Sequence, residues 1–346
     1  MKITHLERTV CRVPFLSGIL PAPEYEEVTS GYPESLDQRR HDVLRIHTDD
    51  GLTGIGMSGP YFGAQADNPP DLIGKNPLDF EPRSLGGGSY QIALLDLIGK
   101  IIGWPLCRLF GGKFQDRILV DYWITRMGPE ASAAAARRAA AEGFHGIKIK
   151  CRLEDGNVAE RIHAMHEAAP ELRIVLDPGH HFHTVEQTLE LARQIETYDI
   201  VFEDPIAKDD WNDYRRLKEE TSVLICPHLQ NPQQVIEAVH LEAVDGINVA
   251  PSDWAFLDMA RIAAAGDVPV WQASNVDLGL FDAFRMHAAA AAANCTLGSD
   301  LCGNFVHEHS LLAEPLVQDG YAVVTDKPGL GVELDEEAIE KYRVRE

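Results

Sequence analysis

Three short apolar runs carry side chains that could transfer a proton or bind a cation. The first run, Gly146–Lys150 (GIKIK), contains Lys148 and Lys150, and the next two end at Asp177 and Glu203. Alternate side chains of an extended strand point the same way, so the two amines share one side. Carboxylate oxygens are ligands that Mg²⁺ prefers. Two ammonium groups crowded beside a cation lower each other's pKa, which predicts that one of them is a neutral base near pH 7.

The spacing of these residues places them on neighbouring strands of one parallel sheet. Asp177 follows Lys148 by 29 residues and Glu203 follows Asp177 by 26. Each interval accommodates a strand, a helix and two loops. Functional side chains at the C-terminal ends of successive parallel strands are typical of an α/β barrel. The sequence therefore predicts that the lysines and the carboxylates meet at one end of such a barrel.

The order of these motifs resembles the mandelate racemase and muconate-lactonizing branch of the enolase superfamily. That branch is suggested by a Lys-x-Lys strand followed by strands that end in Asp and in Glu-Asp-Pro. Residues 45–56 and 93–106 are also similar to the family's capping-domain hairpin and helix, and residues 327–334 to its C-terminal return. The resemblance covers nearly the whole chain. It implies abstraction of a proton α to a carboxylate, with the resulting enediolate held by Mg²⁺.

The implied fold is α/β, a modified TIM-type (β/α)7β barrel with an α+β capping domain formed by the N-terminal region and the C-terminal tail. We expect the capping domain over residues 1–117, the barrel over 118–320 and the return to the cap over 321–346. A chain of 346 residues that is 45% hydrophobic suits one barrel plus a smaller domain. Apolar runs and helical patterns alternate about seven times after residue 118, as such a barrel requires.

Charge and cysteine content limit the partners and the compartment. A net charge of −23 argues against nucleic acid or an anionic membrane as a partner. The six cysteines lie far apart and include no Cys-x-x-Cys pair, which indicates free thiols. Charges stand near the N-terminus where a signal peptide needs an apolar run, so we expect a cytoplasmic protein. Its partner would be a small-molecule carboxylate substrate, and the resemblance implies a homo-oligomer.

The family usually has a third carboxylate ligand at the end of the fifth strand, and this sequence has no acid there. The stretch CPHLQN offers His228, which lies 25 residues beyond Glu203, and the amides of Gln230 and Asn231. Imidazole can bind a divalent ion, although Mg²⁺ prefers amide oxygen to nitrogen. We take His228 as the candidate metal ligand and keep the two amides as alternatives. A loop histidine or a substrate contact is the other interpretation of His228.

The bases that the family uses on the second face of a substrate are missing. The sixth strand, residues 247–252, has no lysine or aspartate, and the seventh, residues 270–277, has no histidine. Two-base racemisation is therefore disfavoured. Asp277 is the candidate for an unorthodox second acid.

A histidine-rich stretch, DPGHHFH, begins at Asp177, and Gly179 stands where the family often has Asn. A zinc site formed by His180, His181 and His183 is one interpretation, but His-His-x-His on a loop lacks a recognised ligand geometry. A general acid or a substrate contact from His180 or His181 is preferred. Solvated loop histidines are the alternative.

The leading hypothesis is a Mg²⁺-dependent lyase, most simply a dehydratase of a hydroxylated, sugar-type carboxylic acid. The metal ligands would be Asp177, Glu203 and His228, while Lys150 removes the α-proton and Lys148 balances the developing charge. β-Elimination needs a base and an acid that can share one face, so the missing second-face residues matter less. A racemase or epimerase is the runner-up.

Two hypotheses from other classes stay open. A barrel lysine could form a Schiff base in an aldolase, but that chemistry gives no reason for carboxylates at successive strand ends. The chain could also be a family member without turnover that acts as a metal-binding protein.

Overall fold

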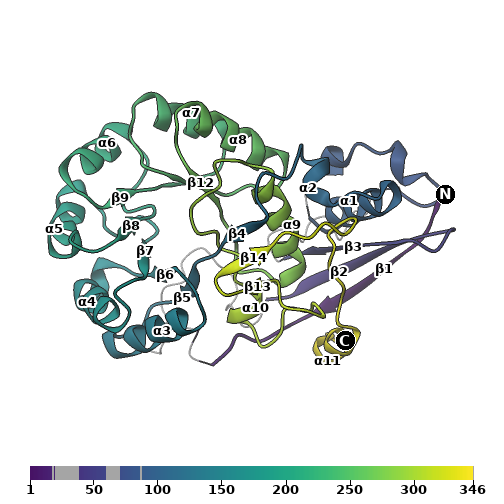
Figure 1. The fold of residues 1–346 in the computed structure, drawn as a ribbon, viewed down its shortest axis with the longest axis horizontal. Coiled ribbons are helices and arrows are strands. Elements are labelled where there is room, and N and C mark those ends of the chain that lie inside the picture. Colours follow the sequence, from purple (N-terminus) through teal and green to yellow (C-terminus); the bar gives the residue numbers. More distant parts are fainter. Residues whose placement is uncertain (18, 20–38, 60–70, 86–87, 346) are drawn as a thin grey trace.

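A three-stranded antiparallel sheet with a helix on it lies beside an α/β barrel in the computed structural model, which describes residues 1–17, 19, 39–59, 71–85 and 88–345 (Figure 1). The antiparallel sheet consists of β1 (Ile3–Cys11), β2 (His41–Thr48) and β3 (Thr53–Ser58), in that order. Helix α1 (Gly88–Ile102) packs on β3. This part contains the hairpin and the helix that the sequence predicted for a cap.

Two glycines of β3 allow the close approach of α1 to the sheet. A Cβ atom on Gly54 would lie 2.2 Å from the carbonyl oxygen of Ala93, and one on Gly56 would lie 2.1 Å from that of Ser89. Real Cβ atoms do not come so close to backbone oxygen, so any larger residue would push the helix off the sheet. The Thr-Gly-Ile-Gly sequence of the hairpin is thereby explained by packing.

The barrel is built from parallel strands that alternate with helices on the outside (Figure 1). The strands are β5 (Tyr122–Ile124), β6 (Gly146–Lys150), β7 (Arg173–Asp177), β8 (Ile200–Phe202), β9 (Leu224–Ile225), β10 (His228–Leu229), β11 (Ile247–Val249) and β12 (Val270–Gln272). The helices are α3 (Pro129–Ala141), α4 (Val158–Ala168), α5 (Val185–Ile195), α6 (Trp211–Glu220), α7 (Pro232–His240), α8 (Trp254–Ala265) and α9 (Gly279–Ala290). The predicted alternation of strands and helices is confirmed.

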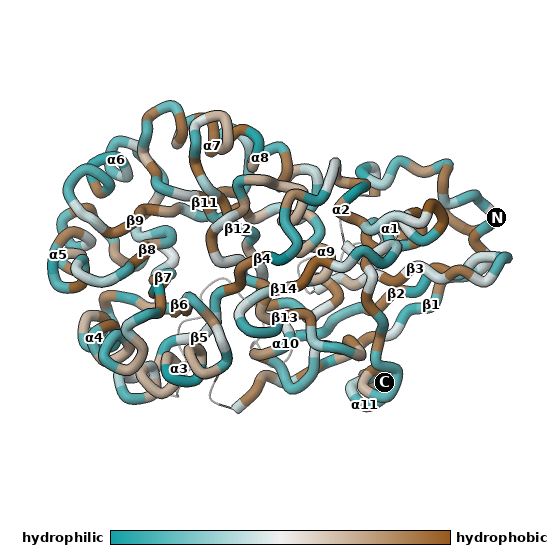
Figure 2. The backbone as a smooth tube through the Cα atoms, in the orientation of Figure 1, coloured by the Kyte–Doolittle hydropathy of each residue, from teal (hydrophilic) through white to brown (hydrophobic). Residues whose placement is uncertain are grey.

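The outer helices are amphipathic, as α6 illustrates. Its buried residues Trp211, Tyr214 and Leu217 recur every three positions and face the barrel. Its other face carries the ion pairs Arg215–Glu219 and Arg216–Glu220, each spanning one helical turn. In Figure 2 hydrophilic residues accordingly gather along the outside of α6.

The first barrel strand is short. Within residues 118–124 only β5 joins the parallel sheet, because β4 (Arg117–Leu119) turns away and pairs with β14 (Tyr321–Val323). β14 in turn pairs with β13 (Val317–Gln318). Residues 117 and 321 thus meet in one small sheet, and the division of the chain at 117/118 and 320/321 stays a prediction.

The barrel closes at residues 295–299 without a regular strand. Isolated bridges join Val270 to Cys295 and Val120 to Ser299. The remaining short elements are η4 (Pro77–Asp79), η5 (Pro82–Leu85), α2 (Leu106–Leu109), η6 (Leu153–Asp155), α10 (Gly303–Val306) and α11 (Glu336–Tyr342). Among the described helices, none is long and apolar enough to cross a membrane.

The buried carboxylate of Asp96 ties the C-terminal return to the cap. It accepts hydrogen bonds from the backbone N–H of Ile55 in β3 and of Leu330, each at 2.8 Å, and from Lys100 Nζ at 2.6 Å. Asp96→Ala leaves two buried N–H groups without an acceptor, so we expect a loss of about 3 kcal/mol in the free energy of unfolding. Urea denaturation measures it. Asp96→Asn keeps one acceptor oxygen and should lose less, and equal losses in both variants would contradict this assignment.

His287 of α9 makes a second link to the return. Its Nε2 donates to the carbonyl oxygen of Leu330 at 3.0 Å, and its Nδ1 accepts from the N–H of Cys107 at 3.3 Å. Both bonds require the neutral ring, and burial lowers the pKa of His287 to about 4. The unfolded chain takes up the proton near pH 6.5, so the stabilisation from this ring is present above pH 6.5 and is lost as pH falls toward 4.

The stability cost of His287→Gln is therefore expected to depend on pH. Between pH 7 and pH 5 the wild-type chain loses about 2 kcal/mol that the variant does not lose, because glutamine has no proton to bind. The difference in unfolding free energy between the two chains, from urea titrations at both pH values, should shrink by that amount. A difference that stays constant would show that folding does not lower the pKa of His287.

Candidate active site

A cavity of about 210 Å³ opens at the C-terminal ends of the barrel strands, where the sequence placed the chemistry. Its volume suits a small molecule. The lining includes Trp123 of β5, both lysines of β6, Asp177 of β7, Glu203 after β8 and His228 of β10. The lining also includes Ser274, Asn275 and Val276, which follow β12, and Asp300 in the barrel's closing segment.

Lys148 is held at the centre of three buried carboxylates. Its Nζ lies 2.8 Å from Glu203 Oε2, 2.9 Å from Asp300 Oδ2 and 3.3 Å from Asp177 Oδ2. Burial by itself lowers the pKa of Lys148, but these carboxylates outweigh it and hold the pKa well above its usual value. The carboxylates thus favour the protonated form of Lys148, contrary to the lowering of its pKa expected from crowding with Lys150 and in keeping with the charge-balancing role predicted for it.

The two strand-end carboxylates respond differently to the same site. Burial raises the pKa of Glu203 to about 8, although Lys148 pulls it down. The pKa of Asp177 is also raised by burial, but Lys150 and Lys148 together reverse this and lower it below the ordinary value. Burial therefore destabilises the ionised form of Glu203 more than that of Asp177, and a cation beside Glu203 would stabilise that form most.

Lys150 occupies the outer position on the same side of β6. Its Nζ lies 2.5 Å from Asp177 Oδ2, and its side chain is 35% exposed where that of Lys148 is 6% exposed. Its carbonyl oxygen accepts from Arg161 Nη1 at 3.0 Å, which fixes the end of the strand. A substrate in the cavity meets Lys150 more readily than the enclosed Lys148.

His228 is positioned in the cavity by a break in the fifth strand. Pro227 cannot donate a backbone hydrogen bond, and the strand is divided there into β9 and β10. The N–H of His228 donates to Asp204 Oδ1 at 2.8 Å, and its Nδ1 lies 3.9 Å from Glu203 Oε1. The alternatives lie elsewhere, since Asn231 caps α7 by accepting from Gln234, and Gln230 is exposed outside the lining.

His228→Ala should therefore weaken Mg²⁺ binding more than Gln230→Ala does. Removing one neutral ligand while the acids remain is expected to cost on the order of 10-fold in affinity, comparable to the loss of a supporting group around a metal. Calorimetric titration with Mg²⁺ measures it. Equal affinity in the His228→Ala and wild-type chains would make His228 a substrate contact.

His180 does not line the cavity, so its predicted role as an acid needs correction. Its backbone has a positive φ of 74°, and its ring turns to Asp204, with Nε2 3.2 Å from Oδ2. Lys208 Nζ lies 3.0 Å from the same ring nitrogen and 2.7 Å from Asp204 Oδ1. His180 thus belongs to the group that holds Asp204, and Asp204 in turn holds His228.

Asp277 also lies outside the cavity lining, although it was predicted to be a second acid. It is fully buried beyond the lining residues 274–276, and its Oδ2 accepts from Arg285 Nη2 at 2.8 Å. Burial raises its pKa, yet Arg285 and His41 outweigh this and hold the pKa below the ordinary value. An ionised, enclosed carboxylate cannot donate a proton to a substrate in the cavity, so Asp277 is withdrawn as the second acid.

Asp300 is a cavity residue that the sequence prediction missed. Besides Lys148 it contacts Asn248 of β11, whose Nδ2 donates to Oδ2 at 3.3 Å. It follows Ser299, whose N–H and hydroxyl contact Leu119 and the N–H of Gln272. The sequence could have indicated Asp300, because it is an acid directly after the last barrel segment. Asn248 lies on the sixth strand, where the family has a base, and it instead donates a hydrogen bond to Asp300.

The donor set fits a divalent cation. Asp177 and Glu203 are buried carboxylates that line the cavity together with the His228 imidazole, and Asp300 is a third buried carboxylate, paired with Lys148. The protonated amine of Lys148 already occupies a cradle of carboxylate oxygens, and oxygen cradles of this kind are what Mg²⁺ takes.

Comparisons with known proteins agree with this geometry. A sequence model of the Enolase C-terminal domain-like family matches residues 130–338. The chain belongs to the enolase superfamily. Within it, the mandelate racemase and muconate-lactonizing branch is the one the match and the structural neighbours indicate.

Relatives of this enolase-superfamily enzyme include both isomerases and lyases. The chain is 22% identical to an N-succinyl-L-Arg/Lys racemase of Bacillus cereus, with 99% of this chain and 98% of that protein covered. It is 26% identical to a D-xylonate dehydratase of Haloferax volcanii, with 87% and 85% covered. The crystal structure of the Bacillus cereus racemase superposes with a TM-score of 0.83 at 20% identity over 100% of this chain and 99% of that one. The fold is thus the barrel with its capping domain.

Proposed function

We propose that the chain catalyses Mg²⁺-dependent dehydration of a hydroxylated, sugar-type carboxylic acid. The observation that carries this proposal is the placement of both cavity lysines on one side of β6. Ser274, Asn275 and Val276, the lining residues that follow β12, include no base. An elimination can proceed from one face, whereas racemisation needs a proton donor on each.

In this proposal Asp177, Glu203 and His228 hold the metal, and bound Mg²⁺ supplies Lewis-acid stabilisation for the substrate carboxylate. Asp300 secures the position of Lys148. Lys148 remains a cation and stabilises the negative charge that develops as the α-proton leaves.

Lys150 is the proposed base. The proton that Lys150 carries in its ion pair with Asp177 first passes to solvent, to which this side chain is partly exposed. The neutral Nζ then takes the α-proton from a substrate in the cavity, and the C–H electron pair forms the new double bond as the β-hydroxyl departs. The proton on Lys150 lies on the same face and is available to the departing hydroxyl, which leaves as water. The enol that results rearranges to a 2-keto-3-deoxy acid. One amine thus serves as base and then as acid, and no role is needed for His180 or Asp277.

Epimerisation is the second candidate, and the full-length similarity to a racemase favours it. It requires a second proton donor opposite Lys150. Among the described lining residues, the titratable groups other than the two lysines and the carboxylates reduce to His228. Its proposed place as a metal ligand makes it a poor proton donor.

A screen of aldonic acids with Mg²⁺ tests the proposal. Formation of a 2-keto-3-deoxy acid, detected as its semicarbazone, is the expected result for at least one of them, and Lys150→Ala serves as the inactive control. A product that keeps the hydroxyl and differs only in configuration would replace dehydration with epimerisation. Mg²⁺ binding without turnover of any acid would indicate a metal-binding member of the superfamily.

A further inference from the structure

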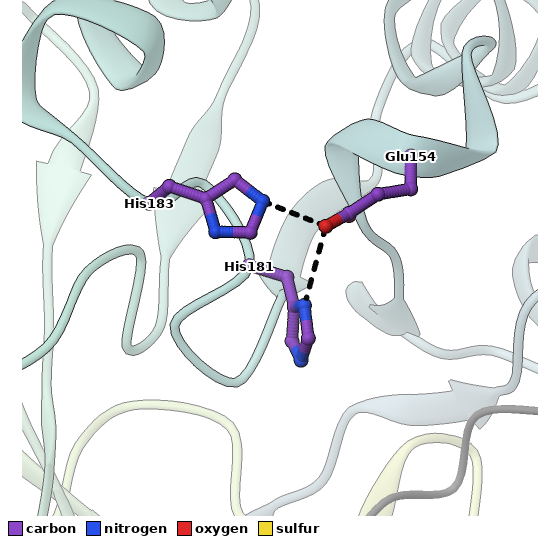
Figure 3. A group of neighbouring side chains, drawn as sticks. All are labelled: Glu154, His181 and His183. Atoms are coloured by element: carbon purple, nitrogen blue, oxygen red, sulfur yellow. Dashed lines mark hydrogen bonds and ion pairs between the residues drawn. The ribbon is translucent and has the colours of Figure 1, made fainter.

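Three side chains from two neighbouring loops converge outside the cavity (Figure 3). Glu154 belongs to η6, which follows β6, while His181 and His183 lie in the loop that follows β7. Glu154 Oε1 is 2.7 Å from His183 Nε2 and 3.6 Å from His181 Nδ1. One ligand atom from each residue lies within 4.8 Å of the others. None of the three lines the active-site cavity.

One nitrogen of this cluster is buried and poorly satisfied. His181 Nδ1 is enclosed, and its partner is Glu154 Oε1 at 3.6 Å, a distance slightly too long for a good hydrogen bond. Buried polar atoms in folded proteins normally have a close partner, so this long contact leaves the nitrogen poorly satisfied. Figure 3 shows both imidazole rings directing a nitrogen at the same carboxylate oxygen. A cation bound to that oxygen would satisfy all three groups.

The scaffold that carries the cluster is rigid. Phe182, between the two histidines, is fully buried and packs edge-on against Phe202 at 5.3 Å. On the other loop, buried Asp155 fixes η6 by accepting from Arg126 Nε at 3.0 Å and from the N–H of Arg152 at 3.1 Å. The N–H of Leu153 donates to the carbonyl oxygen of His181 at 3.3 Å and joins the two loops. The three side chains therefore need only small rotations to close on an ion.

We propose that Glu154, His181 and His183 form a second metal site, for a borderline divalent ion such as Zn²⁺. Two imidazoles and one carboxylate are a donor set that Zn²⁺ accepts with a fourth position open to water, and nitrogen ligands favour it over Mg²⁺. From the sequence alone zinc was disfavoured because His-His-x-His on a loop lacks a recognised ligand geometry. In the structure the third ligand is instead Glu154 from another loop, while His180 turns to Asp204. Bound metal would cross-link the loops that follow the strands of Lys150 and Asp177. This inference does not depend on the proposed reaction.

Calorimetric titration of the full chain with Zn²⁺, in excess Mg²⁺, tests the site. We expect one Zn²⁺ per chain, with Glu154→Ala and His183→Ala each weakening it by at least about 10-fold, since even outer partners of a metal are worth that much. His180→Ala is the matched control from the same loop, and exposed His240→Ala is a remote one. Both should leave Zn²⁺ affinity unchanged. Running the series in an Asp177→Ala background excludes binding in the cavity.

A second readout is hydrogen exchange at the amide of Leu153, which bridges the two loops. Zn²⁺ should slow this exchange in the wild-type chain and leave it unchanged in His183→Ala, because a ligand stabilises the segments that it joins. Equal Zn²⁺ affinity in the wild-type, Glu154→Ala and His183→Ala chains would overturn the proposal. So would loss of binding in His180→Ala alone.

Discussion

Lys150→Ala is expected to abolish exchange or removal of the α-proton of a substrate. Lys150 is the more exposed of the two cavity lysines, and general-base catalysis by a positioned side chain contributes about 10²–10⁴ in rate. The same residue serves as base and acid in the proposed reaction, so we expect the upper end of that range. The rate of α-deuterium incorporation in D₂O measures it, with far-UV circular dichroism to confirm folding.

Arginine at this position separates a base from a simple positive charge. Lys150→Arg keeps the charge beside Asp177, but a guanidinium does not lose its proton in proteins, so the variant should be as inactive as Lys150→Ala. Lys148→Arg should instead retain part of the activity that Lys148→Ala loses, because a single preorganised charge is worth about 10²–10³ in rate. Substantial exchange in Lys150→Arg would show that Lys150 acts only through its charge.

Asp177→Ala and Glu203→Ala are each expected to abolish Mg²⁺ binding. Both side chains are buried acids that point into one cavity, and Mg²⁺ depends on such oxygen ligands. Calorimetric titration with Mg²⁺ gives the affinity. Asp199→Ala removes a half-exposed acid that pairs with Arg173 away from the cavity lining, and it should bind Mg²⁺ as the wild type does. Unaltered affinity in both cavity variants would remove the metal site from this account.

Residues at the ends of regular strands were the predictable part of the site. Lys148, Lys150 and Asp177 lie on β6 and β7, where alternation and strand spacing determine which way a side chain points. Glu203 follows β8 directly, and the structure brings all four together. Their identification as ligands and base remains a prediction.

Residues on irregular segments were not predictable in the same way. Asp300 follows a closing segment that forms isolated bridges and no named strand. Strand alternation therefore could not predict which way its side chain points. The positive φ of His180 directs its ring away from the cavity. Asp277 is held away from the cavity by its hydrogen bond to buried Arg285, eight residues further along the chain. Glu154 joins His183 across 29 residues and two loops. Such contacts depend on tertiary packing that local patterns do not contain.

Proton exchange by the wild-type chain tests the central claim most directly. A substrate from the aldonic acid screen is incubated in D₂O with Mg²⁺, and both configurations at the α-carbon are followed by nuclear magnetic resonance. Because both lysines lie on one strand face and the lining residues Ser274, Asn275 and Val276 include no base, we expect the α-proton to be exchanged or removed in one configuration only. Deuterium that enters both configurations at similar rates would reveal a base on the second face and contradict the one-faced dehydratase.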